Sequence, residues 1–242
     1  MPIRRVFQAA AVAVLLGGAA ASEVAADRAA MVRDIERKIG RGEAGQLRRL
    51  DPRIGEVMRR TPRHLFVPES HRSAAYLDTP LPIGHEATIS QPFMVAAMTQ
   101  LADPSAGDVV LEVGTGSGYQ AAVLSPLVRR VYTVEIVEPL ARTAADRLRA
   151  LGYANVEVRA GDGYAGWPEH APFDAIIVTA GATHVPQPLV RQLKAGGRMI
   201  IPVGPHGDQE LTIVEKTADG RVRERTVMAV RFVPLQERAR RR

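Results

Sequence analysis

The spacing of apolar residues predicts helices in the first part of the chain. Apolar residues recur at helical spacing over residues 31–39, and two glycines follow them. Asp51 and Pro52 are typical of a helix start, because aspartate caps free N–H groups and proline fits the first turn. Helical spacing returns over 93–101, whereas the proline-punctuated stretch 79–84 indicates extended chain. We therefore predict a helical N-terminal lobe.

After residue 107 the pattern changes to short, nearly all-apolar runs, as expected of strands buried on both faces. These runs cover residues 109–113, 131–136, 156–158, 174–179 and 198–203. Helical patterns separate the first four, and this alternation predicts a parallel sheet between layers of helices. Two further runs, 211–215 and 225–233, are joined through Asp219-Gly220 and predict an antiparallel hairpin. The predicted fold is α/β, a Rossmann-like sandwich with a mostly parallel sheet, a C-terminal antiparallel hairpin and a helical N-terminal lobe.

Composition agrees with one ordinary globular domain. The 242 residues are 46% hydrophobic and 24% charged, which excludes a disordered chain, a fibre and a long coiled coil. There is no cysteine, so disulfide frameworks, thiolate metal sites and cysteine nucleophiles are excluded. The six histidines are scattered and do not have metal-ligand spacing. We therefore expect no metal.

The net charge of +6 is unevenly distributed. All of the excess lies within residues 1–63, while residues 64–242 carry equal numbers of acidic and basic side chains. Four of those basic side chains are arginines of the tail, residues 237–242. Binding to phosphates requires a dense basic surface on the folded body of a protein. The charge pattern therefore predicts no nucleic-acid partner.

The first residues have the pattern of a secretory signal. Arg4 and Arg5 precede an apolar run at 9–16 and a series of small residues. The run is too short to span a bilayer, so we expect no stable membrane association. The alternative is that the native chain starts at Met31. We divide the sequence into a signal-like leader (1–26), one domain (27–236, with a helical lobe at 27–80 and a core at 81–236) and a basic tail (237–242).

A glycine-rich turn ends the first predicted strand, at the edge of the sheet where ligands of such folds bind. The sequence there reads Glu112-Val113-Gly114-Thr115-Gly116-Ser117-Gly118. Its glycines permit a tight turn and a close approach of a ligand to the backbone. The dinucleotide pattern G-x-G-x-x-G is not met, because Gly118 is out of register. Together with Glu112, the turn suits S-adenosyl-L-methionine, which has an ammonium group and an adenosine but no pyrophosphate.

Acidic residues follow at the ends of the next two predicted strands. Glu135 closes the second strand, where a carboxylate can accept hydrogen bonds from both ribose hydroxyls. Asp162 and Gly163 follow the third strand, where the acid would meet the adenine amino group. Taken singly, Glu135 is equally typical of a solvated strand end and Asp162 of a turn. Together with a glycine-containing turn at 193–198, these spacings favour nucleoside binding. The predicted cofactor residues are Glu112, Gly114, Gly116, Gly118, Glu135, Asp162 and Gly163.

Seven stretches carry a resemblance to a known family. They read PRHLFVP (62–68), YLDTPLPIG (76–84), TISQP (88–92), LEVGTGSGYQ (111–120), APFDAIIVT (171–179), PVG (202–204) and VRFVPL (230–235). Over residues 31–235 the chain thereby resembles the protein-L-isoaspartate (D-aspartate) O-methyltransferase family, a class I S-adenosylmethionine-dependent methyltransferase family. The glycine-rich stretch is shared by many methyltransferases, whereas the others together are specific. One departure is Glu86-Ala87, where many members of the family have Gly-Gln.

The resemblance implies a protein repair enzyme. Such enzymes methylate the free carboxyl of L-isoaspartyl residues in damaged proteins, and the ester leads through a succinimide to normal aspartate; D-aspartyl residues are left open as further substrates. Ser90 matches the family's active-site serine, whose hydroxyl would orient the substrate carboxyl. The residue types alone favour Ser90 as an N-cap of the helix that follows. We expect Thr88 and Ile89 to shape the substrate entrance.

Two other functions remain alternatives. The first is a methyltransferase acting on nucleic acids or small molecules, although Thr179-Ala180-Gly181-Ala182 stands where nucleic-acid amino methyltransferases have Asn/Asp-Pro-Pro-aromatic. The second is a non-catalytic module that binds an adenosine compound. We expect a monomer in the cytoplasm, where the methyl donor is made; the alternative, if the leader is functional, is the periplasm.

Overall fold

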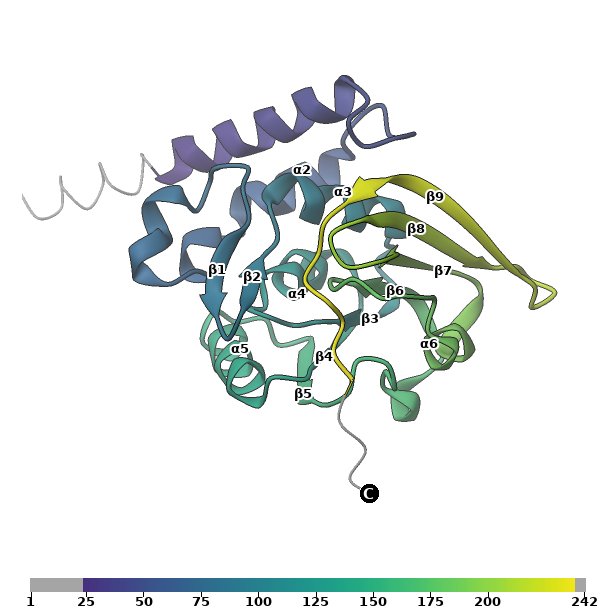
Figure 1. Cartoon of the computed structure of the whole chain (residues 1–242). Helices are drawn as coiled ribbons and strands as arrows, with labels where there is room; N and C mark the ends of the chain where they lie inside the picture. Colours follow the sequence, from purple (N-terminus) through teal and green to yellow (C-terminus); the bar gives the residue numbers. More distant parts are fainter. Residues whose placement is uncertain (1–23, 238–242) are drawn as a thin grey trace, which may run out of the picture.

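The computed structural model describes residues 24–237, so the signal pattern and most of the basic tail lie outside the described residues. A seven-stranded sheet has the order β5-β4-β3-β6-β7-β8-β9 (Figure 1). Its strands are β3 (Val109–Val113), β4 (Arg130–Glu135), β5 (Val156–Ala160), β6 (Phe173–Val178), β7 (Leu193–Val203), β8 (Gln209–Lys216) and β9 (Val222–Val230). Strands β3 to β7 pair in parallel, and β8 and β9 are antiparallel. The predicted α/β fold with a closing hairpin is confirmed.

Alternate residues of the strands build a hydrophobic core on each face of the sheet. In β3, Val110 belongs to one core and Leu111 to the other. The first face is covered by the N-terminal lobe together with α3 (Pro92–Ala102) and α4 (Tyr119–Leu124). The second core includes Trp167 and residues of α6 (Gln187–Gln192). Helix α5 (Glu138–Ala150) packs against β4 and β5, and its Leu148 joins the first core. Burial on both faces explains why these strands are nearly all apolar.

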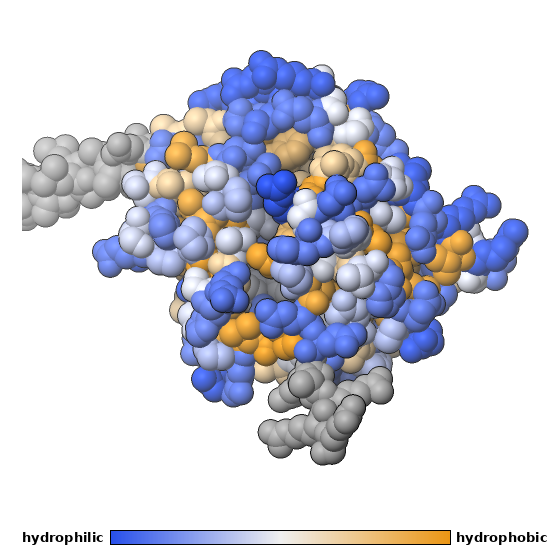
Figure 2. All heavy atoms as spheres, in the orientation of Figure 1, coloured by the Kyte–Doolittle hydropathy of each residue, from blue (hydrophilic) through white to orange (hydrophobic). Residues whose placement is uncertain are grey.

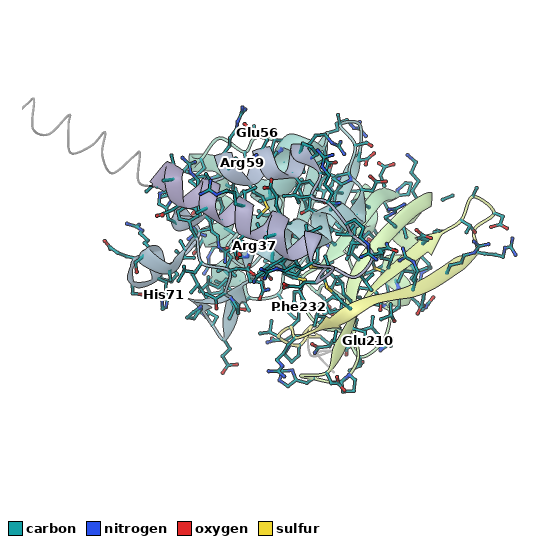
Figure 3. All side chains as sticks on the ribbon, turned by 90° about the horizontal axis from the view of Figure 1, so that it is seen from above. Arg37, Glu56, Arg59, His71, Glu210 and Phe232 are labelled. Atoms are coloured by element: carbon teal, nitrogen blue, oxygen red, sulfur yellow. The ribbon has the colours of Figure 1, made fainter. Side chains whose placement is uncertain are left out.

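The N-terminal lobe consists of short elements around two helices. Residues 24–40 are helical, and Asp51 caps α2 (Pro52–Arg60) as predicted. The 3₁₀ turns η1 (Arg63–Leu65) and η2 (Glu69–Ala74) lead to an antiparallel hairpin of β1 (Leu81–Gly84) and β2 (Ala87–Ile89). Figure 3 shows the first helix beside α2. Arg59 of α2 forms an ion pair with Glu36 of the first helix at 3.1 Å. None of the helices formed by residues 24–237 has the length and apolar composition of a membrane-spanning segment.

Two details of the predicted sheet are wrong. The connection from β5 to β6 holds no α-helix, only the 3₁₀ turn η4 (Pro168–His170), because closely spaced glycines and prolines interrupt a helical pattern there. Strand β7 begins at Leu193, so the turn predicted at 193–198 lies inside the strand as an irregularity. The register shifts at that point, and Gly196 has a left-handed φ of +84° that accommodates the bulged residues.

Candidate functional site

A cavity of about 400 Å³ opens at the carboxyl ends of β3, β4 and β6. Its wall is built from the glycine-rich turn, the end of β4, the loop after β6, the β1–β2 hairpin and the C-terminal segment after β9. In the space-filling view of this face, the centre is hollowed and bordered by both hydrophilic and apolar side chains (Figure 2). The cavity lies where the strand order reverses from β3 to β6, the usual ligand position in such sheets.

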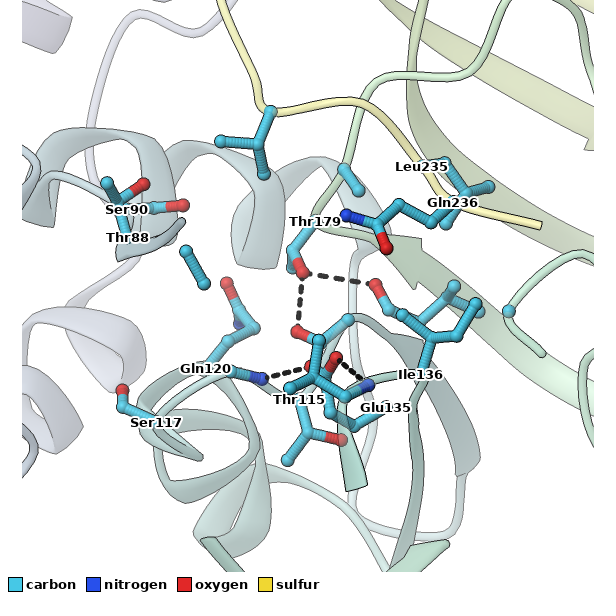
Figure 4. Close-up of a pocket in the computed structure, with 18 of the residues that line it drawn as sticks. Thr88, Ser90, Thr115, Ser117, Gln120, Glu135, Ile136, Thr179, Leu235 and Gln236 are labelled. Atoms are coloured by element: carbon cyan, nitrogen blue, oxygen red, sulfur yellow. Dashed lines mark hydrogen bonds between the residues drawn. The ribbon is translucent and has the colours of Figure 1, made fainter. Parts of the chain in front are cut away.

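The glycine-rich turn is fastened to the loop after β6. Gly114 has a φ of +95°, and a Cβ atom there would lie 2.5 Å from Oγ1 of Thr179. The Thr179 hydroxyl donates to the carbonyl oxygen of Gly114 at 2.7 Å (Figure 4). Gly116, with a φ of +51°, lines the cavity. Gly118 is the N-cap of α4 and, unlike Gly114 and Gly116, does not line the cavity. A Cβ atom on Gly118 would lie 3.1 Å from Cδ1 of Leu148, so the glycine lets the turn pack closely against α5.

Glu135 lies at the base of the cavity and supports the same turn. Its Oε2 accepts a hydrogen bond from the Gly116 N–H at 2.8 Å, and its Oε1 accepts one from the Val137 N–H at 3.0 Å (Figure 4). The residue is only 7% exposed, so the alternative of a solvated strand end is wrong. Each carboxylate oxygen has a second lone pair, which leaves Glu135 able to accept further hydrogen bonds from a ligand.

Glu112 is a fully buried carboxyl group on the cavity wall. Neither carboxyl oxygen makes a hydrogen bond of ordinary geometry within residues 24–237. Burial raises the pKa of Glu112 to about 8, against the opposing effect of the nearby Thr133 hydroxyl, and the charge of Glu135 raises it further. A buried carboxyl with unused acceptors in a ligand cavity is suited to a cationic or hydrogen-bond-donating ligand group.

Replacing Glu112 with glutamine is expected to change how stability depends on pH. In the unfolded chain the carboxyl ionises near the ordinary glutamate pKa of 4.5, whereas in the folded protein it stays protonated up to about pH 8. The wild-type protein therefore loses stability as pH rises between these values, and glutamine removes that loss. We expect a Tm at pH 8 higher by at least ~2–4 °C in the variant, and a smaller difference at pH 5. Both Tm values are measured by differential scanning calorimetry. If the Tm of the variant differs from that of wild type by the same amount at pH 5 and at pH 8, Glu112 is ionised in the folded protein at both pH values.

Ser90, Thr88 and Ile89 all line the cavity, at the end of β2. Helix α3 begins after Gln91 and has no side-chain cap of its own. The N–H of Phe93 in its first turn instead donates to Oδ1 of Asp78, at 2.7 Å. The alternative that Ser90 caps this helix is therefore wrong. The Ser90 hydroxyl has no hydrogen-bond partner within the described part of the chain, and Figure 4 shows Ser90 and Thr88 together at one side of the cavity.

Of the two predicted cofactor residues that follow β5, only Gly163 lines the cavity. Gly163 lines the cavity, and a Cβ atom there would lie 2.6 Å from a methyl carbon of Val113. Asp162 is not on the cavity wall, and its Oδ1 accepts the N–H of Tyr164 at 2.9 Å, as in a turn. Its predicted contact with adenine stays a prediction. Within residues 24–237, no three histidine or acidic side chains are grouped as a metal site would need.

The C-terminal segment is a part of the site that the sequence pattern did not predict. Residues 233–236 line the cavity, because β9 ends at Val230 and the chain then crosses the ends of the parallel strands (Figure 1). The Gly181 N–H donates to the Val233 carbonyl at 2.8 Å, and the Leu235 N–H donates to the Gly181 carbonyl at 2.7 Å. The sequence predicts a strand over 225–233, and its last three residues lie outside β9 because the chain there pairs with Gly181 instead. The other wall residues that were not predicted include Thr115, Ser117, Gln120, Thr179 and His206.

Comparisons with known proteins give one consistent result. Residues 44–240 match the family model described as protein-L-isoaspartate (D-aspartate) O-methyltransferase. The chain is 58% identical to protein-L-isoaspartate O-methyltransferase 2 of Syntrophobacter fumaroxidans over 90% of this chain and 89% of that relative. It is 56% identical to protein-L-isoaspartate O-methyltransferase 1 of Cupriavidus necator, over 90% of this chain and 85% of the relative.

Solved structures agree with the sequence relatives. One protein-L-isoaspartate O-methyltransferase superposes with a TM-score of 0.74 at 30% identity, covering 86% of this chain and 65% of that one. A Plasmodium falciparum chain solved with S-adenosyl-L-homocysteine superposes with a TM-score of 0.72 at 24% identity, covering 87% of this chain and 99% of that one. The second likeness supports the fold.

Proposed function

The chain belongs to the protein-L-isoaspartate (D-aspartate) O-methyltransferase family, and from that premise we propose that its cavity methylates the free carboxylate of L-isoaspartyl residues with S-adenosyl-L-methionine as methyl donor. The single observation that carries this proposal is the fully buried Glu112, which lines the same cavity as Ser90. Repair follows after release, when the amide nitrogen of the following residue attacks the methyl ester and methanol leaves. The succinimide that forms is hydrolysed in part to normal aspartate.

The residues around the cavity fit the methyl donor. Glu112 would accept hydrogen bonds from its ammonium group, which supplies the donors that the buried carboxyl lacks. Glu135 would use its remaining lone pairs for the ribose hydroxyls. Gly116 and Gly163 let the backbone approach the adenosine closely, and Asp162 would bind the adenine amino group. When bound, S-adenosyl-L-methionine supplies an electrophilic methyl group on a sulfonium.

For this reaction the protein has to orient the substrate carboxylate, and it does not need a general base to ionise it. A side-chain carboxyl has a pKa near ~4, so the substrate carboxylate is already a nucleophile at neutral pH. Its oxygen forms the new bond to the methyl carbon as the carbon–sulfur bond breaks. Ser90 would donate a hydrogen bond that holds the carboxylate in line, with Thr88 and Ile89 beside it. Residues 233–236 of the C-terminal segment line another part of the cavity wall and would limit access of water there.

The test is transfer of a radiolabelled methyl group to an isoaspartyl peptide. The matched controls are the same peptide with a normal aspartyl residue, and RNA. Base-labile label on the isoaspartyl peptide alone is expected, because a carboxyl methyl ester is hydrolysed by base. Stable label on RNA would instead identify a nucleic-acid methyltransferase, and no label on any substrate would identify a binding module without turnover.

We further propose that the enzyme is a metal-independent monomer in the cytoplasm. The methyl donor is made there, so a periplasmic enzyme would depend on delivery of its donor. The chemistry needs no Lewis acid, since the nucleophile is already ionised. N-terminal sequencing of the native protein from separated cell fractions tests the location, and a mature start near Ser22 in the periplasm would overturn it.

A further inference from the structure

We propose that Asp78, together with Lys38, is a positioning residue for the methyl transfer, and that it acts by fixing the segment that carries Ser90. The inference rests on the proposed function, because it assigns to Asp78 a part in the same reaction. Neither residue lines the cavity, so neither contacts substrate or cofactor. What matters is therefore how Asp78 connects the N-terminal lobe to the cavity wall.

Asp78 is the meeting point of three parts of the chain. Its side chain is only 6% exposed, and its Oδ2 accepts a hydrogen bond from Lys38 Nζ, on the helix of residues 24–40, at 2.5 Å. Its Oδ1 accepts the N–H of Phe93 at 2.7 Å. The Lys38 ammonium also lies 5.9 Å from the centre of the Phe93 ring, within the range of a cation–π interaction. Lys38, Asp78 and Phe93 thus contact one another.

The segment before Asp78 is anchored in the lobe at two further points. The fully buried Arg63 donates through Nε to the Ala75 carbonyl at 2.8 Å. Nδ1 of His64 shares a hydrogen bond with the Tyr76 hydroxyl at 2.5 Å. Together with the ion pair between Lys38 and Asp78, these two hydrogen bonds hold residues 75–78 against the N-terminal lobe. Asp78 is the residue that connects this segment to α3, through its hydrogen bond with the Phe93 N–H.

The bond between Asp78 and Phe93 closes a loop that contains Ser90. Residues 78–93 comprise β1, the hairpin turn, β2 and the first turn of α3. Inside this loop Leu81 pairs with Ile89, directly before Ser90, and Phe93 follows three residues after it. Ser90 therefore lies between two fixed points, although its own hydroxyl makes no cap. Closing a loop restricts the positions that its residues can reach.

The Asp78 bonds hold the segment that carries Ser90, on the substrate side of the cavity, and they do not involve the residues expected to bind the methyl donor. Glu112 and Glu135 lie in β3 and β4, which pair with each other in the sheet. The glycine-rich turn follows β3 and is held by the bond from the Gly116 N–H to Glu135. Loss of the Asp78 bonds should displace Ser90 and leave these donor-binding groups in place. Because small misplacements of reacting groups are costly, we expect a loss of rate without a loss of donor affinity.

The experiment compares Asp78→Ala, Asp78→Asn and Lys38→Met with the matched control Asp51→Ala. Asp51 also caps a helix, accepting the Arg53 N–H at 2.8 Å and pairing with the Arg53 guanidinium, but it lies in the lobe away from the cavity. Each variant is assayed well below its Tm for kcat, for KM toward the isoaspartyl peptide and for donor Kd by titration calorimetry. We expect kcat to fall about tenfold in Asp78→Ala, with donor Kd within about twofold of wild type.

The other variants separate positioning from plain stability. Asp78→Asn keeps an acceptor for the Phe93 N–H and should recover part of the lost kcat. Lys38→Met removes the ion pair with Asp78 and the cation–π contact with Phe93. It leaves the hydrogen bond from the Phe93 N–H to Asp78, so its kcat should lie between those of wild type and Asp78→Ala. Asp51→Ala should lower Tm, with kcat unchanged. In a Ser90→Ala background the Asp78→Ala change should cost little further kcat, because both act through one hydroxyl.

Three results would overturn the inference. They are an unchanged kcat in Asp78→Ala, an equal loss of kcat in Asp51→Ala, or fully additive effects with Ser90→Ala. If Asp78→Ala fails to fold, Asp78→Asn and Lys38→Met decide, and wild-type kcat in both would reject it. A wild-type enzyme that does not methylate the isoaspartyl peptide would be a failure of the proposed function, which the same assay shows separately.

Discussion

Replacing Glu135 with alanine is expected to weaken binding of S-adenosyl-L-methionine by about ten- to a hundredfold. A hydrogen bond to a charged acceptor contributes about 1.5–3 kcal/mol, which corresponds to that range of affinity. The side chain also holds the Gly116 and Val137 N–H groups, so its removal would loosen the turn that faces the donor. Both effects act in the same direction.

The measurement is isothermal titration calorimetry on the purified variant. Glu138→Ala is the matched control, because Glu138 is a neighbouring carboxylate on α5 whose side chain is 65% exposed and is paired with Arg142. The control should bind the donor as wild type does. Glu135→Ala should also melt at a lower temperature, since two N–H groups lose their acceptors. A donor affinity equal to wild type would remove Glu135 from the cofactor site.

The parts of the fold and site that the sequence predicts are local in the chain. Strands β3, β4 and β6 are recognisable because each is a short apolar run buried on both faces. The carboxyl ends of parallel strands meet at one edge of a sheet, so the sequence alone places Glu112 and Glu135 together. Both line the cavity.

The parts that the sequence does not predict depend on contacts between distant residues. Ser90 stands where an N-cap is typical, but the N–H of Phe93 is taken by Asp78 from the preceding segment. No local pattern reveals that competition. In the same way, residues 233–236 join the cavity wall only because they pair with Gly181 in the loop after β6. Sequence spacing describes neither contact, since both are decided by tertiary packing.

Asp78, and not Ser90, accepts the free N–H in the first turn of α3, so replacing Ser90 should have little effect on stability. If the hydroxyl capped α3, Ser90→Ala would cost about 0.5–2 kcal/mol of stability. Because Asp78 supplies that acceptor, we expect the Tm of Ser90→Ala to stay close to wild type. Donor affinity should also be unchanged, since the donor side is built from β3 and β4. Asp78→Ala is the positive control for loss of the cap, and it should lower Tm.

The rate of methyl transfer should respond strongly to the same substitution. A hydrogen bond to the substrate carboxylate is worth about 1.5–3 kcal/mol, so Ser90→Ala should lower kcat/KM for the isoaspartyl peptide by about 10- to 100-fold. Ser90→Thr keeps a hydroxyl and should retain more activity than alanine. Ser90→Asp places a negative charge beside the incoming carboxylate and should be slower than alanine, because like charges repel. Normal turnover in a folded Ser90→Asp enzyme would mean that the isoaspartyl carboxylate binds elsewhere in the cavity.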